Sequence, residues 1–339
     1  MRHPHYSLKV NKDADRAVMV EAVRRTLGVC GSEAEYRYVG MGGPFLDDLR
    51  LIHTAFPRMS LLSVEENPET KKRQEFHRFA NETVLTLKHR SVHEFIRSDY
   101  TPAEKEIIWL DHTNFGKEAV NDFVYLASKV PLGSLLRITV CGQWLETLPA
   151  AIDEEAWKKT FARFLSKFEI LAPQKLEPED FTQPKRYATL VKNILLGAVR
   201  NELTPPVSRY FQPLTATMYR DETQMLSLTG LIIATPSADR QISIGSEVCD
   251  VNVAKAFSDW DLASLDGTAL HMLDLPALSH KERLALQQFL PLHDDASKEA
   301  CVKGLAYLVG DSAADHRSRM LRYASLARYY TQFAKLTPP

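Results

Sequence analysis

Two features of the sequence suit the recognition of a nucleoside. Glycines at a tight turn let the backbone approach a ligand closely, and an acidic residue about 25 positions later can accept hydrogen bonds from a ribose diol. The chain has such a turn at Gly40-Met41-Gly42-Gly43 and a pair of acidic residues at Glu65-Glu66. This combination predicts an adenosine site.

Two further stretches carry groups that could take part in a reaction. Ser91-Val92-His93 follows one predicted strand, and Asp111-His112-Thr113-Asn114 follows the next. An imidazole titrates near neutral pH, so His112 is the candidate for a base that takes a proton from an acceptor. Asn114 is a candidate for positioning that acceptor.

The order of the predicted elements explains how these stretches could share one site. Strands and helices alternate from residue 36 to residue 140, which is typical of βαβ units and a parallel, doubly wound α/β sheet. In such a sheet the carboxyl ends of neighbouring strands form the ligand crevice. The predicted strands are 36–39, 59–64, 83–87, 106–110 and 134–140, and the predicted helices between them are 45–56, 68–80 and 117–129.

The rest of the chain divides into three predicted parts. Residues 1–33 form an N-terminal helical segment, and 34–236 form a Rossmann-like domain with a helical insertion at 153–207. An antiparallel hairpin of strands 215–219 and 224–235 completes a seven-stranded sheet. Residues 237–339 form a helical C-terminal domain, in which Ser279 to Glu282 matches a capping box. In helix 68–80 we expect Phe76 and Phe79 to point inward.

Over about residues 34 to 235 the sequence resembles the class I S-adenosylmethionine-dependent methyltransferases. The turn at 40–43 is similar to the glycine-rich first motif of that class, and Glu65-Glu-Asn-Pro-Glu69 is similar to its acidic second motif. Leu110 to Asn114 stands where the fourth motif closes the methyl-transfer site. The chain is most similar to bacterial O-methyltransferases of unassigned substrate, and the resemblance implies a mostly parallel seven-stranded sheet.

The resemblance also implies a role for each matched residue. S-adenosylmethionine would bind with its methionine and ribose against the glycine turn, its ribose hydroxyls on a carboxylate and its adenine beyond the third strand. The implied cofactor residues are Gly40, Met41, Gly42, Gly43, Glu65 (with Glu66 competing for its role), Ser91, Val92 and Asp111, and the implied catalytic residues are His112 and Asp111.

The expected reaction is methyl transfer to oxygen, or less favourably to nitrogen, on an unidentified acceptor. The residues at 111–114 do not match the Pro-Pro-aromatic signature of amino-methyltransferases, and the residues at 140–143 lack the acidic end of metal-dependent enzymes, so no metal is expected. Two alternatives remain. One is a catalytically inactive module that acts as an interaction or regulatory subunit. The other is a nicotinamide-dependent oxidoreductase, against which Phe45 stands where a third glycine would be needed.

Composition limits the partners and the location. The 339 residues are 45% apolar with a formal net charge of −1, so no overall field attracts nucleic acid or an anionic membrane. Nucleic acid binding by the arginines and tyrosines at 317–330 stays open but is not favoured, and oligomeric state is undetermined. Without a leader or a membrane span the expected location is cytoplasmic. The cysteines Cys30, Cys141, Cys249 and Cys301 show no zinc or disulfide spacing and are expected to be reduced.

Overall fold

The computed structural model describes residues 9–144, 154–168, 171–173, 175–203, 208–245 and 247–330. The chain forms two compact units. The first includes Met19–Met218 and Glu222–His271, and the described residues of the second are 9–18, 219–221 and 272–330. Helix α1 (Val10–Cys30) contributes to both units, so residues 1–33 are not a separate part as predicted.

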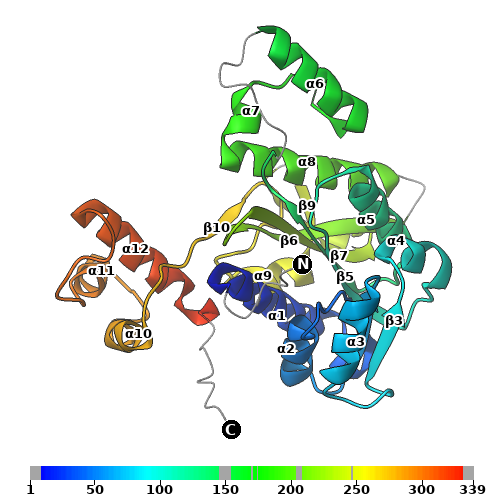
Figure 1. The fold of residues 1–339 in the computed structure, drawn as a ribbon, viewed down its shortest axis with the longest axis horizontal. Helices are drawn as coiled ribbons and strands as arrows, with labels where there is room; N and C mark the ends of the chain where they lie inside the picture. The colour runs from blue at the N-terminus through cyan, green and yellow to red at the C-terminus, as the bar shows by residue number, and fades with distance from the viewer. Residues whose placement is uncertain are drawn as a thin grey trace. The chain divides into compact units, whose positions relative to one another are not determined.

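The first unit is built on a twisted sheet that confirms the predicted doubly wound α/β fold (Figure 1). Its strands follow the order β10-β6-β7-β5-β4-β1-β2-β3. The five strands from β3 to β5 are parallel neighbours, as the alternation of strands and helices predicts. They are β1 (Tyr36–Gly40), β2 (Ser60–Glu65), β3 (Leu85–His89), β4 (Lys105–Asp111) and β5 (Ser134–Cys141).

The hairpin predicted to finish the sheet is present and longer than expected. It consists of β6 (Arg209–Arg220) and β7 (Gln224–Ala234), and β7 runs antiparallel to β5. The sheet has eight strands rather than seven, because the three-residue strand β10 (His271–Leu273) follows β6 in the order, where the chain leaves the first unit.

Helices cover both faces of this sheet, with α2 and α3 on one side and α5 and α8 on the other (Figure 1). Side chains alternate along each strand, so Val39 and Ile108 join the core under α5 and α8. The helices of this unit beyond α1 are α2 (Asp47–Ala55), α3 (Pro68–Phe76), α4 (Val92–Glu94) with the π-turn Phe95–Asp99, α5 (Lys117–Lys129), α6 (Glu154–Phe168), α7 (Glu179–Thr182), α8 (Pro184–Glu202) and α9 (Val251–Phe257).

The predicted orientation of Phe76 is wrong. Helix α3 buries Thr70 and Gln74, and it ends at Phe76, whose side chain is 86% exposed. Phe76 is two residues beyond Gln74, and two residues turn an α-helix by about 200°. The aromatic side chain therefore lies opposite the buried face.

The boundary between the units lies at His271 rather than at 236–250 as predicted. Residues 241–250 form the hairpin of β8 (Gln241–Ile244) and β9 (Glu247–Asp250), so this stretch is not helical. The following loop is tied to the first unit, because Ser264 N donates to Leu214 O at 2.8 Å and Lys192 Nζ donates to Thr268 O at 2.8 Å. These long-range bonds could not be anticipated from composition.

The C-terminal unit is helical as predicted. It contains α10 (His280–Gln287), α11 (Asp295–Val302) and α12 (Ala313–Leu326), and the capping box of Ser279 and Glu282 at α10 is confirmed. The last nine residues of the predicted helical domain, 331–339, lie outside the described residues. Short 3-10 turns occur at Glu33–Glu35, Ala238–Arg240 and Ala327–Tyr329.

Two other sequence-based expectations can be compared with the structure. All four cysteines are free, and Cys141, Cys249 and Cys301 are buried. Within the described ranges, no helix is both long and apolar enough to cross a membrane.

Candidate active site

The glycine turn at the end of β1 requires glycine for its backbone. Gly42 and Gly43 have φ angles of 64° and 52°, which a residue with a Cβ adopts only with strain. Gly43 N donates to Met41 O at 2.8 Å, so the chain reverses within three residues. After the turn the chain continues into α2.

Two buried side chains support this turn, and neither was predicted from the sequence. Gln74 Nε2 on α3 donates to Met41 O at 3.2 Å and to Gly43 O at 2.9 Å. Ser63 Oγ on β2 lies 3.4 Å from Met41 O and 3.2 Å from Gln74 Oε1. Ser63 and Gln74 are fully buried, so the turn is fixed by hydrogen bonds that water does not reach.

Gly40 faces another pair that the sequence analysis missed. Tyr38 OH donates to Asp48 Oδ2 at 2.7 Å, and a Cβ at Gly40 would lie 2.7 Å from that same oxygen. Glycine at position 40 therefore leaves room for the side chains of Tyr38 and Asp48. The signal available in the sequence was the acidic pair at the start of α2, which favours a helix N-terminus.

Glu65 and Glu66 differ in their surroundings. Glu65 is half-buried at the end of β2 and Glu66 is exposed. Glu65 Oε1 accepts a hydrogen bond from Asn67 N at 2.8 Å, and burial raises the pKa of the Glu65 carboxyl above its usual value. Asn67 caps α3 by accepting from Glu69 N and Thr70 N, each at 3.0 Å. Of the two acidic residues, Glu65 is the one held in a fixed orientation.

After β3, Ser91 and Val92 have different surroundings. Ser91 is the N-cap of α4, where its Oγ accepts from Glu94 N at 3.2 Å and its own N–H donates to Glu94 Oε2 at 3.3 Å. Both groups are thus already used within the capping box. Val92 instead contributes an apolar wall to the hollow described next.

Residues of β1, β2 and β4, together with the segment that follows β3, border one small apolar hollow. Its volume is about 10 Å³, which is room for about one water molecule. Three of the predicted site residues line it: Gly40, Met41 and Val92. The hollow is not lined by the other predicted site residues, which are Gly42, Gly43, Glu65, Glu66, Ser91, Asp111 and His112. The remaining lining residues are Val39, Val64, Phe95, Ile96, Ile108, Trp109, Leu110 and Leu126.

His112 follows β4 and has an unusual environment for an imidazole. Its backbone N–H donates to Thr139 O at 2.8 Å, which extends the pairing of β4 with β5. Its Nε2 is buried and has no hydrogen-bond partner within the described part of the chain. Burial lowers the pKa of His112, although the nearby carboxylates of Asp122, Asp111 and Glu118 act in the opposite direction. This direction favours the neutral form of the ring, which can accept a proton.

A second hollow is lined by residues that follow β4 and β5, and His112 is not among them. Its volume is about 200 Å³. Asn114, which the sequence analysis singled out, lines it together with aromatic and polar side chains. The other lining residues are Phe115, Cys141, Gln143, Trp144, Lys167 and Tyr187.

Comparisons with known proteins found distant similarities to solved methyltransferase structures. The plantazolicin methyltransferase BamL is 10% identical over 69% of this chain and 92% of its own, with a TM-score of 0.39. An arsenic(III) S-adenosylmethionine methyltransferase from Chlamydomonas reinhardtii is 13% identical over 63% of this chain and 67% of its own, with a TM-score of 0.35. No curated protein sequence matches the chain.

A family model, in contrast, matches nearly the whole chain. The family is Methyltransf_35, described as "Putative O-methyltransferase", and the match covers residues 4–338. Such a match includes the sheet, both hollows and the C-terminal unit. The chain therefore belongs to the Methyltransf_35 family and is a class I S-adenosylmethionine-dependent methyltransferase.

Proposed function

We propose that this methyltransferase acts on an oxygen atom and that His112 takes the proton that the oxygen loses. The observation that carries this proposal is the buried Nε2 of His112, which has no hydrogen-bond partner among the described residues and lies two residues before Asn114, a lining residue of the 200 Å³ hollow. A neutral imidazole with an unused nitrogen is a suitable general base. Asp111, which precedes His112, is proposed to act on the cofactor side.

The residues at the ends of β1, β2 and β3 fit the cofactor S-adenosylmethionine. Three of the four residues in the turn are glycines, which let a ligand approach the backbone closely, and the half-buried Glu65 carboxylate suits the hydroxyls of a ribose. We assign Gly40, Met41, Gly42 and Gly43 to the methionine and ribose side. Val92 presents an apolar surface suited to adenine, with Ser91 holding the turn and exposed Glu66 outside the contact.

The chemistry divides between cofactor and protein. S-adenosylmethionine supplies a methyl group that is already activated by a positively charged sulfur. The protein has to align the acceptor with that methyl group and to remove one proton. His112 Nε2 accepts the proton, while Asn114 and Gln143 offer amides that can position the acceptor in the second hollow.

The second hollow limits the size of the group that reacts. Pockets that enclose a drug-sized ligand measure roughly 300–1,000 Å³, so a hollow of about 200 Å³ holds only the reacting part of a larger acceptor. Phe115, Trp144 and Tyr187 give it aromatic walls. Four free cysteines support a reducing compartment, so we propose the bacterial cytoplasm as the location.

Two pairs of variants test the assignments. Purified protein is titrated with S-adenosylhomocysteine and then incubated with labelled S-adenosylmethionine and a cell extract. Glu65→Gln should weaken cofactor binding about tenfold, as expected for lost hydrogen bonds to a charged group, whereas Glu66→Gln should leave it unchanged. His112→Gln should retain binding but reduce labelled product about 10²–10⁴-fold. His280→Gln, on the C-terminal unit, is the matched control.

The outcomes separate the alternatives. Unchanged turnover in His112→Gln would remove the base from the proposal. A label attached to nitrogen in the product, identified by mass spectrometry, would contradict oxygen as the target. Cofactor binding without any labelled product would favour the inactive module, and binding of NAD instead would favour an oxidoreductase.

A further inference from the structure

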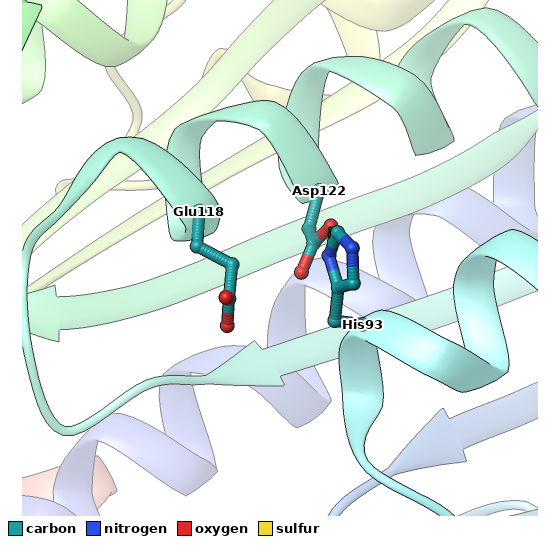
Figure 2. A group of neighbouring side chains, drawn as sticks. All are labelled: His93, Glu118 and Asp122. Atoms are coloured by element: carbon teal, nitrogen blue, oxygen red, sulfur yellow. Dashed lines mark hydrogen bonds and ion pairs between the residues drawn. The ribbon is translucent and has the colours of Figure 1, made fainter.

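Three side chains that can bind metal ions meet beside α5. They are His93 on α4 and Glu118 and Asp122 on α5, and one donor atom of each lies within 4.8 Å of the other two. Figure 2 shows Glu118 and Asp122 on the same side of α5, one turn apart, with the ring of His93 next to the Asp122 carboxylate. The spacing of four residues places both carboxylates on one face of the helix.

Asp122 is the central residue of this group. Its side chain is fully buried, and Oδ1 accepts a hydrogen bond from His93 Nδ1 at 2.8 Å. Oδ2 is also buried but has no hydrogen-bond partner among the residues that the structure describes. Burying a carboxylate oxygen without a partner is costly. Its surroundings therefore leave a position for a positively charged ligand.

The balance of charge favours a cation. Glu118 and Asp122 repel each other at this helical spacing. The Arg97 guanidinium faces Asp122, but its Nη2 is 3.9 Å from Asp122 Oδ1 and its Cζ lies over the Tyr125 ring at 4.0 Å. It therefore makes no close hydrogen bond to the carboxylate. The His93 side chain is 45% exposed, so an ion can enter from solvent.

We propose that His93, Glu118 and Asp122 bind one divalent first-row transition-metal ion, with water completing its coordination. One imidazole nitrogen with two carboxylates suits Zn²⁺ or Mn²⁺, whereas Ca²⁺ and Mg²⁺ prefer oxygen ligands alone. This site departs from the expectation, drawn from the sequence, that the protein holds no metal. It does not involve the loop after β5, on which that expectation rested.

The distances are compatible with such an ion after a small adjustment. Two ligands of a tetrahedral zinc ion lie about 3.3 Å apart, given metal–ligand bonds of about 2.0 Å. The 2.8 Å between His93 Nδ1 and Asp122 Oδ1 is close to this value, and binding would replace that hydrogen bond with two bonds to the ion. The exposed Glu118 side chain can rotate to close the remaining distance.

Binding of an ion would connect two parts of the fold. His93 adjoins Val92, which lines the hollow at the strand ends, and Asp122 belongs to a helix packed on the sheet. The ion would hold α4 against α5. It is therefore a positioning and stabilising site, and its existence does not depend on the proposed base or acceptor.

The test uses the full-length protein with Zn²⁺ as the probe. After dialysis against a chelator, zinc chloride is titrated in by calorimetry, and bound metal is measured on the desalted protein. We expect one equivalent of Zn²⁺ and a higher melting temperature. Losing even a supporting partner of a metal ligand costs about 10–100-fold in affinity, so Glu118→Gln, His93→Gln and Asp122→Asn should each weaken binding at least tenfold.

Controls make the result decisive. Glu155→Gln and His280→Gln remove the same kinds of groups elsewhere and should leave zinc binding unchanged. Glu118 is exposed, so its variant should fold even if Asp122→Asn does not. Equal zinc affinity in wild type and Glu118→Gln, or no zinc bound by wild type, would overturn the proposal and leave His93 and Asp122 as a simple pair. Neither result would depend on whether methyl transfer is observed.

Discussion

The two halves of the strand-end region satisfy their polar groups in different ways. At the ends of β1 and β2, Met41 O and Gly43 O accept hydrogen bonds from the buried Gln74 side chain. Around α5, the buried atoms His112 Nε2 and Asp122 Oδ2 have no such partner in the described ranges. In the first half, the carbonyl groups of the turn are hydrogen-bonded without a ligand. In the second half, two buried atoms can still form a hydrogen bond or bind an ion.

This difference indicates that the two halves have different roles. Satisfied buried hydrogen bonds fix one geometry, which suits the binding of a cofactor in a constant position. Unsatisfied buried groups cost stability and are kept where a reaction or a ligand uses them. Changes in the first half should therefore reduce stability, and changes near α5 should reduce activity or metal binding with little effect on folding.

The largest expected effect is that of Gly42→Ala. A Cβ at this position would lie 2.7 Å from Leu49 Cδ1 and 2.8 Å from Ser63 Oγ, in a backbone with φ of 64°. Strain and overpacking together should lower the free energy of unfolding by about 3 kcal/mol, measured by urea denaturation. Gly28→Ala is the control, because its site in α1 has open space and alanine should gain about 0.5–1 kcal/mol.

A result in which both glycine variants behave alike would contradict the strain argument. If Gly42→Ala were as stable as wild type, the backbone of the turn could change its conformation without cost. The turn would then not be the fixed half of the strand-end region.

The second prediction concerns the buried amide that supports the turn. Gln74→Ala leaves Met41 O and Gly43 O without this donor and should cost about 2 kcal/mol. Cofactor binding should weaken as well, because the turn is no longer held in one conformation. Gln288→Ala is the matched control on an exposed helix end, with an expected change within about 0.5 kcal/mol. A stable variant with normal cofactor affinity would show that Gln74 does not fix the turn.

The sequence was sufficient for the parts of the fold that depend on local patterns. Every end of the five parallel strands was predicted within two residues, because buried strands and the turns between them have clear signatures. Helix α5 was predicted at its observed bounds, 117–129, and α6 lies within the helical insertion predicted at 153–207. The boundary at His271 was not predicted, since it depends on hydrogen bonds from Ser264 and Lys192 to distant segments.

The candidate site was predictable only where it follows strand ends. Gln74, Asp48 and Asp122 lie on helices, and what they contact depends on packing that a strand-end argument does not include. Asp122 nevertheless left a signal, since it is placed among the buried Ala119, Val120 and Phe123 of α5. A carboxylate on the apolar face of a helix indicates a buried charge that needs a partner.

The third prediction concerns pH. Burial lowers the pKa of His112 in the folded protein below its ordinary value of about 6.5. At a pH between these two pKa values, His112 therefore binds a proton more often in the unfolded chain than in the folded protein. Stability due to this residue should therefore fall as the pH drops through that window, by at most about 1.4 kcal/mol per pH unit. His112→Leu should remove this slope, seen as the difference between the denaturation curves of the two proteins.

At neutral pH the same variant should fold as well as wild type, because the Nε2 atom that it removes makes no hydrogen bond in the described structure. Its turnover should nevertheless be lost. If His112→Leu were strongly destabilised at pH 8, an unseen bond would have to satisfy Nε2, and the contrast between the two halves would be wrong.

The smallest effect is expected for Ser63→Ala. Ser63 Oγ is fully buried, but it is 3.4 Å from Met41 O and 3.2 Å from Gln74 Oε1, and both distances are long for a hydroxyl hydrogen bond. Met41 O would keep its bonds from Gln74 Nε2 and Gly43 N. The free energy of unfolding should fall by less than about 1 kcal/mol, and cofactor affinity should stay constant. A loss as large as that of Gln74→Ala, in the same urea titration, would mean that Ser63 orients the amide and that the turn depends on the pair rather than on Gln74 alone.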